Sequence, residues 1–190
     1  MKINQEDNLL IQSYFTISFL TELKNNNFLN SDYYKKMNFE DAYIKENLPT
    51  IGIDNQGTLL IFLYVMLVIP KQLLDKVFPN EFVELNKKLD RIKSFAESNY
   101  KRDKESIDYL RHIRNAVAHA RVEFIPTVSV TFKDKDNRTN EFCSITIPLV
   151  SIGEFLTELQ KMFFVYLENL KQKPIKKSVV KWEFLGSKKT

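Results

Sequence analysis

The chain has few of the residues that interrupt regular structure or cross-link a small fold. Its 190 residues include four Gly, six Pro and one Cys. The lone thiol, Cys143, cannot close an internal disulfide, so the sequence is not that of a disulfide scaffold. The scarcity of Gly and Pro favours regular structure over a loop-rich fold. Because 44% of the residues are hydrophobic, the chain is long enough for one domain with its own core.

Long apolar runs are also missing. The most apolar run, TLLIFLYVMLVIP, covers only residues 58–70, whereas a helix needs roughly 20 apolar residues to cross a bilayer. This run predicts a buried core helix. The start of the chain, MKINQEDNLL, lacks the basic and then apolar pattern of a signal peptide. We therefore expect a cytoplasmic protein that does not contact a membrane.

Positive charge is concentrated at the end of the chain. The net charge is +4, but residues 171–190 alone carry seven Lys against one Glu, so the remainder is slightly acidic. This distribution argues against a strongly basic nucleic-acid-binding body. It predicts a basic C-terminal tail over 171–190, which is either simply solvated or contacts phosphate backbones in a salt-dependent way.

Apolar residues recur at three- and four-residue steps over most of residues 1–170, which predicts one mainly α-helical domain of about four to five helices. A short helix or ordered loop is expected near residues 31–48. The last helix is expected to begin with Ser151 as N-cap, because Glu154 stands three residues later. The longer helices are predicted at Asn4–Lys24, from about Asp54 to Ile69, at Asn80–Asn99, at Asp103–Arg121 and from Ser151 to Leu170.

The period changes from helix to strand after Pro126. TVSVTF and FCSITI alternate around the polar stretch KDKDNRTNE, which predicts an antiparallel β-hairpin at about residues 127–148. The C-terminal SVVKWEF leaves two alternatives open, either a third strand added to the hairpin or a partly disordered tail.

The stretch YLRHIRNAVAHARVEF, residues 109–124, holds both histidines of the chain. On a helical wheel, Leu110, Ile113 and Val117 form an apolar stripe that predicts anchoring to the core. The opposite, polar face carries arginine, asparagine and histidine: Arg111, His112, Arg114, Asn115 and His119. Such a face suits a phosphodiester, because guanidinium groups hold phosphate oxygens and imidazole exchanges protons near neutral pH.

A metal site is not expected at this helix. His112 and His119 are seven residues apart, about 10 Å along a helix axis, which is too far for two ligands of one zinc ion. Only one cysteine is present, and the carboxylates do not cluster around either histidine in the sequence. We predict neither a metal nor another cofactor.

The segment RNAVAH, Arg114 to His119, resembles the R-x-x-x-x-H signature of the HEPN superfamily, in which a polar residue, often Asn, follows the arginine. The resemblance extends to the apolar helix opened by NQG and closed at a proline, and to the phrase RNAVAHARVEF. Over about residues 1–170 the chain is similar to small HEPN proteins associated with defence and plasmids.

The resemblance implies a HEPN-like helical bundle and a metal-independent endoribonuclease that acts as a homodimer, with the motif helices of two subunits at a composite site. It implies that Arg114, Asn115 and His119 are catalytic, and that the RNA product ends in a 2′,3′-cyclic phosphate. Arg111, His112 and Arg121 are the expected substrate contacts. The implied role is that of a toxin or abortive-infection effector with a cognate antitoxin or another defence protein as partner.

One position departs from part of the family. Members paired with nucleotidyltransferase antitoxins carry a tyrosine two residues after the histidine, where AMP is attached, but this chain has Arg121 there. The alternative function is a non-catalytic module that binds a nucleotide or a protein through the same polar face and acts as a regulatory or assembly subunit.

Overall fold

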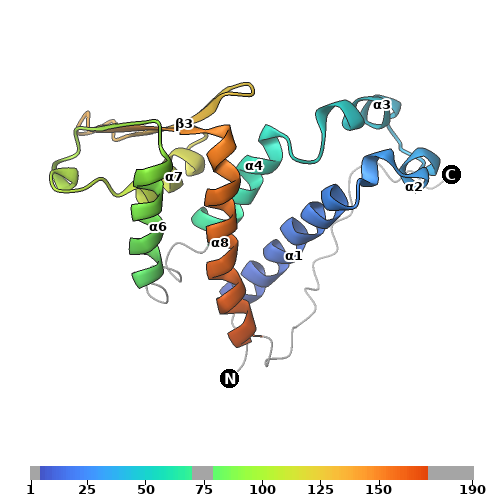
Figure 1. Cartoon of the computed structure of the whole chain (residues 1–190), viewed down its shortest axis with the longest axis horizontal. Helices are drawn as coiled ribbons and strands as arrows, with labels where there is room; N and C mark the ends of the chain where they lie inside the picture. Colours follow the sequence, from blue (N-terminus) through green and yellow to red (C-terminus); the bar gives the residue numbers. More distant parts are fainter. Residues whose placement is uncertain (1–4, 70–78, 171–190) are drawn as a thin grey trace.

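Helices account for most of the structure, and the prediction of a mainly α fold is confirmed. The computed structural model describes residues 5–69 and 79–170. The helices lie beneath a small β-sheet (Figure 1). They are α1 (Gln5–Asn25), α2 (Asp32–Lys36), α3 (Ala42–Ile51), α4 (Gln56–Leu63), α6 (Pro79–Ile92), α7 (Tyr109–Ala118) and α8 (Leu149–Leu170), with short helical turns η1 (Phe28–Asn30), η2 (Tyr64–Val68) and η3 (Lys101–Asp103).

Polar side chains set the starts of several helices. Ser31, Asp41 and Asn55 each accept a hydrogen bond from a backbone N–H in the first turn, at Tyr34, Tyr43 and Thr58, which satisfies donors that have no partner inside a helix. Asn55 is one of the two caps expected from the sequence, and the other, Asp54, pairs with Lys24 instead.

The apolar run forms α4 and then a π-helical turn, η2, in which the Ile69 N–H donates to the Tyr64 carbonyl at 3.1 Å. Leu63 and Met66 are fully buried, in agreement with the predicted core helix. Among the described residues, no single helix combines the length and apolarity of a membrane span. Only Ala42–Ile51 and Gln56–Val68 taken together reach them, and the chain bends by 83° between the two.

The described residues contain one antiparallel sheet with the strand order β1-β4-β3-β2. β3 and β4 are the predicted hairpin. β1 and β2 were not predicted, and the helix expected over Asn80–Asn99 ends at Ile92 because the Ser94 N–H donates to the Thr146 carbonyl and the chain joins the edge of β4. The strands are β1 (Phe95–Ser98), β2 (Val122–Ile125), β3 (Ser129–Lys135) and β4 (Phe142–Pro148).

The core lies between the inner face of the sheet and the helices. Every second residue of β3 and β4 points inward, and Phe132 and Ile145 are fully buried there. Helix α7 packs under β3 and contributes Ile113 and Ala116, which are also fully buried. The apolar stripe predicted for the motif helix therefore holds that helix against the sheet, at the centre of the domain.

The last helix begins earlier than expected. β4 ends at Pro148 and α8 starts directly at Leu149, whose N–H donates to the Val128 carbonyl at 2.9 Å. Ser151 therefore lies inside the helix, and the prediction that it is the N-cap is wrong. The third strand considered for the C-terminal segment falls on residues 171–190, outside the described residues.

Candidate active site

Helix α7 is shorter than the predicted Asp103–Arg121 helix at both ends. It begins after Asp108, whose side chain accepts from the Arg111 N–H at 3.2 Å. At the other end His119 is the C-cap, and Ala120 takes a left-handed conformation with φ of 52°. The Ala120 N–H then donates to Val117 O at 3.2 Å and the Arg121 N–H to Ala116 O at 2.8 Å. These two bonds form a Schellman motif, which ends the helix at the functional motif.

His112 lies at the centre of a buried polar network. Its Nδ1 is 2.7 Å from Oδ2 of Asp134 on β3, and its Nε2 is 2.7 Å from Oδ2 of Asp103 at the end of η3. The ring also packs on Tyr100, with 4.8 Å between the ring centroids. His112 is only 1% exposed. The expectation that it lies on an open polar face and contacts substrate is wrong, because both ring nitrogens are engaged inside the protein.

Arg111 belongs to the same network. Its Nη2 donates to Asp103 Oδ1 at 2.9 Å, and its Nε lies 3.5 Å from Asp108 Oδ2. The guanidinium carbon is 5.1 Å from the centroid of the Tyr100 ring, within the range of a cation–π contact. Arg111 is buried to nine-tenths. The predicted substrate contact through Arg111 is therefore wrong in this structure, since carboxylates and an aromatic ring already hold its charge.

The two aspartates of the network stay ionised for a clear reason. Burial raises the pKa of Asp103, but hydrogen bonds from Ser98 and His112 lower it more, so the net pKa is lowered. Burial likewise raises the pKa of Asp134, and hydrogen bonds from His112 and Asn115 outweigh that effect. Burial and the nearby charge of Asp134 raise the pKa of Tyr100 to about 12, so its hydroxyl keeps its proton.

The sequence contained a signal for Asp134 that the periodicity analysis did not use. In the strand SVTFKDK, alternation places Val130, Phe132 and Asp134 on the same inward face. An aspartate at an inward position needs a buried partner, and the nearest helix supplies His112 and Asn115. No comparable signal marks Asp103, which reaches His112 from an irregular segment.

The network also offers ligand atoms that a metal ion would use. One atom each from Asp103, His112 and Cys143 lie within 4.8 Å of one another, so carboxylate and histidine do cluster in space although not in sequence. The donor set fits a metal poorly. The Arg111 guanidinium already contacts His112 Nε2 at 2.6 Å, and burial raises the pKa of the Cys143 thiol to about 12, which disfavours the thiolate that binds metals.

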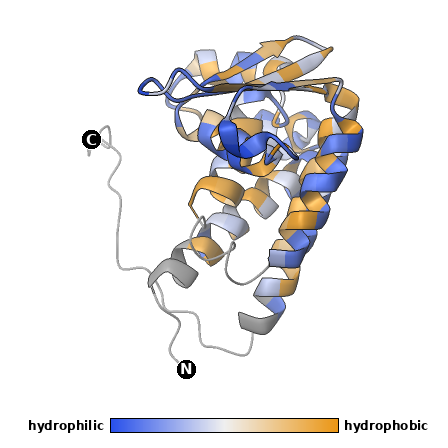
Figure 2. Ribbon diagram, turned by 90° about the vertical axis from the view of Figure 1, so that its left-hand side faces the viewer, coloured by the Kyte–Doolittle hydropathy of each residue, from blue (hydrophilic) through white to orange (hydrophobic). Residues whose placement is uncertain are grey.

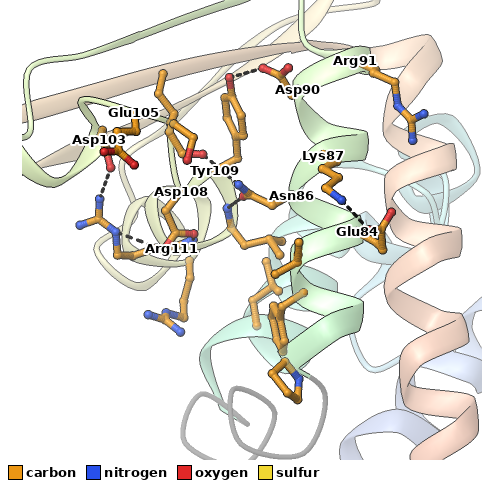
Figure 3. A pocket seen from close by; sticks show the side chains of 18 residues that line it. Glu84, Asn86, Lys87, Asp90, Arg91, Asp103, Glu105, Asp108, Tyr109 and Arg111 are labelled. Atoms are coloured by element: carbon orange, nitrogen blue, oxygen red, sulfur yellow. Dashed lines mark hydrogen bonds and ion pairs between the residues drawn. The ribbon is translucent and has the colours of Figure 1, made fainter.

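A groove runs between α6 and α7, and Arg114 and Arg111 are among its lining residues (Figure 3). Asn86 on α6 joins the two helices, because its amide donates to Ile107 O at 2.9 Å and accepts from the Leu110 N–H at 3.1 Å. The start of α7 is thereby fixed in place. His119 does not line this groove, so a single chain does not bring Arg114 and His119 into one cavity.

The C-terminal end of the motif is open to solvent. His119 is exposed, and so are its neighbours Ala118 and Ala120. One turn earlier, Asn115 is half-buried and donates to Asp134 Oδ2 at 3.0 Å. Arg121 is half-buried and donates from Nη1 to the Lys135 carbonyl at 2.6 Å. The structure therefore holds Asn115 on the buried network and presents His119 outward from a fixed helix end.

The comparisons with known proteins agree with this motif. The family model described as HEPN pEK499 p136 matches residues 1–170, which is most of the chain and includes the whole of α7. Comparison with curated proteins and with solved structures gives no match.

Proposed function

This chain belongs to the HEPN superfamily, and from that premise we propose that it is a metal-independent endoribonuclease that acts as a homodimer. The proposed biological role is that of a toxin or abortive-infection effector, with a cognate antitoxin or another defence protein as its regulator. Arg114, Asn115 and His119 are the proposed catalytic residues, and Arg121 is a proposed substrate contact.

The observation that carries this proposal is the position of His119. It stands exposed at the end of a helix whose other end is held by buried contacts, and both of its neighbours are alanines. Small neighbours allow a second large molecule to approach the imidazole closely. An imidazole held in this way can exchange a proton with a bound substrate near neutral pH.

The proposed reaction is an internal transesterification of RNA. The 2′-oxygen attacks the phosphorus, a base takes the 2′ proton, and the bond from phosphorus to the 5′-oxygen breaks as an acid supplies a proton to that oxygen. The products are a 2′,3′-cyclic phosphate and a 5′-hydroxyl. The reaction needs one base and one acid, and each chain offers one exposed histidine. A homodimer would provide both as two copies of His119.

Arg114 and Asn115 fit supporting roles in this reaction. Arg114 is half-buried five residues before His119, and a guanidinium can stabilise the charge that develops on the phosphate oxygens. Asn115 is held through its Nδ2 by Asp134, so its amide oxygen is fixed in orientation and can accept a hydrogen bond from substrate or from the partner subunit.

The test is RNA cleavage by the purified protein in excess EDTA. We expect cleavage by the wild type, and a loss of about 100-fold or more in His119→Ala or Arg114→Ala, the size typical of a missing acid–base or electrostatic group. Lys161→Ala, an exposed residue of α8 paired with Glu158, is the control and should cleave normally. Unchanged cleavage in His119→Ala would contradict the proposal.

Growth provides a second reading of the same variants. Expression of the wild type should arrest growth, and His119→Ala or Arg114→Ala should relieve the arrest. The non-catalytic module predicts a different pattern, namely binding of a nucleotide or protein ligand with no RNA cleavage at any enzyme concentration.

A further inference from the structure

The outer face of the sheet is open in the described part of the chain. Along β2 and β3, inward residues such as Val130 and Phe132 are buried, whereas the outward Glu123, Lys133 and Lys135 are exposed. The described helices all lie on the other side of the sheet, as Figures 1 and 2 show. A sheet with one covered face and one open face can bind a partner across the open one.

One end of this open face is basic. Lys133 and Lys135 point outward from β3, two residues and about 7 Å apart along the strand. Arg121 stands opposite Lys133, because the register that pairs Val122 with Phe132 continues by one residue and the Lys133 N–H donates to the Arg121 carbonyl. We call Arg121, Lys133 and Lys135 the basic strip.

An aromatic side chain adjoins the basic strip. Phe142 on β4 is the register partner of Lys135 and is partly exposed on the same outward face. The nearest acidic residue on this face, Glu123, pairs with Lys133 at 2.6 Å and neutralises only one of the three cations. Positive charge beside an aromatic ring suits single-stranded nucleic acid, in which phosphates need cations and unpaired bases stack on aromatic rings.

The basic strip is continuous with the motif. Arg121 follows His119 by two residues, and both its backbone carbonyl and its guanidinium are hydrogen-bonded to β3, at Lys133 and Lys135. A polymer lying along the strip therefore passes the exposed end of α7. The hairpin thus connects an extended binding surface to the exposed histidine.

We propose that the basic strip, together with Phe142, binds the single-stranded RNA substrate and leads it to His119. This inference rests on the proposed ribonuclease function, which it deepens by assigning single-stranded RNA as the substrate class. The lysines contact successive phosphates, and Phe142 stacks on a base. An RNA duplex is excluded as the preferred substrate because its bases are not free to stack on Phe142.

The test uses binding rather than cleavage. A short fluorescein-labelled 2′-O-methyl RNA cannot undergo attack by a 2′-hydroxyl, and its fluorescence anisotropy reports its affinity for the intact protein. We expect Lys133→Ala/Lys135→Ala to weaken binding about tenfold at low salt. The slope of log affinity against log salt concentration should fall by about 1.4, because two contacts to phosphates of a single strand are lost. Lys133→Arg/Lys135→Arg should restore binding.

The matched control is Lys35→Ala/Lys161→Ala. These two lysines are also exposed and also paired with acidic residues, but they lie on α2 and α8. Their removal changes the net charge by the same amount and should leave affinity within about twofold of the wild type, since distant charges are screened by salt. Equal losses in the two double variants would overturn the inference, since net charge alone would then explain binding.

The two proposals fail in different ways. Cleavage by the wild type together with equal RNA affinity in the two double variants would overturn the basic strip and leave the nuclease standing. Strip-dependent binding without cleavage would support the strip and contradict the nuclease. If no variant binds RNA, the strip proposal is overturned, and an acidic protein surface becomes the partner to examine.

Discussion

The two histidines of this chain sit seven residues apart on the same motif, and the structure treats them in opposite ways. His112 is 1% exposed and has a carboxylate on each ring nitrogen. His119 is exposed at the helix end, and no described carboxylate forms an ion pair with it. The difference teaches that one half of the motif holds the helix in place while the other half is available for chemistry.

This division has a geometric cause. Helix α7 lies between the sheet above and α6 beside it, and its first two turns are enclosed by Asp103, Tyr100 and Asp134. The last turn reaches the end of the sheet, where Ala120 reverses the chain into β2. The same residue type therefore has a structural role at one end and a proposed catalytic role at the other.

Loss of each histidine should separate the two roles. His112→Ala leaves two buried carboxylates without their shared partner, and we expect a loss of about 3–5 kcal/mol in the free energy of unfolding. His119→Ala removes an exposed side chain, so its unfolding free energy should stay within about 0.5 kcal/mol of the wild type. Urea denaturation followed by circular dichroism measures both. Similar losses in the two variants would show that the comparison is mistaken.

The buried network should also respond to pH. Because the pKa values of Asp103 and Asp134 are lowered on folding, the folded state binds fewer protons than the unfolded state in acid. Their stabilisation is complete above the ordinary carboxyl pKa of about 3.9 and is lost as the pH falls below it. Asp134→Asn should cost about 3 kcal/mol near pH 7, and the difference from the wild type should shrink near pH 3.

An exposed carboxylate provides the control for this pH effect. Asp54 also has a lowered pKa, mainly through a hydrogen bond from Lys24, but both side chains are more than half exposed. Asp54→Asn should change the unfolding free energy by less than about 1 kcal/mol, because surface ion pairs contribute little. If Asp54→Asn and Asp134→Asn show the same pH dependence, the network around His112 has no special electrostatic role.

The sequence predicted what depends on local period and composition. The core helix with Leu63 and Met66, the β3–β4 hairpin and the apolar stripe of α7 all follow from spacing, and the structure has each of them. It did not predict β1, because four residues are too few to show alternation, and Phe95 fitted the helical period of α6. It did not predict the burial of His112, because both carboxylates that surround it come from other segments.

The predicted C-terminal end of the motif helix was wrong for a specific reason. A helix usually stops at Gly or Asn, because these residues take the left-handed conformation at little cost, and the sequence AHAR contains neither. Here Ala120 adopts φ of 52° all the same. The sheet that begins at Val122 fixes this turn through the Lys133–Arg121 hydrogen bond, so tertiary structure overrides the local preference.

The smallest expected effect follows from that turn and compares two alanines on either side of His119. Ala120→Gly relieves the strain of a left-handed alanine and should raise the free energy of unfolding by about 0.5–1 kcal/mol. Ala118→Gly places the same substitution in the last helical residue and should lower it by about 0.5–1 kcal/mol. Thermal denaturation of the two variants in parallel measures the sign of each change. The same sign in both would mean that α7 does not end at His119. Opposite signs would support the view that the fold itself, rather than a local stop signal, places His119 at the exposed end of the helix.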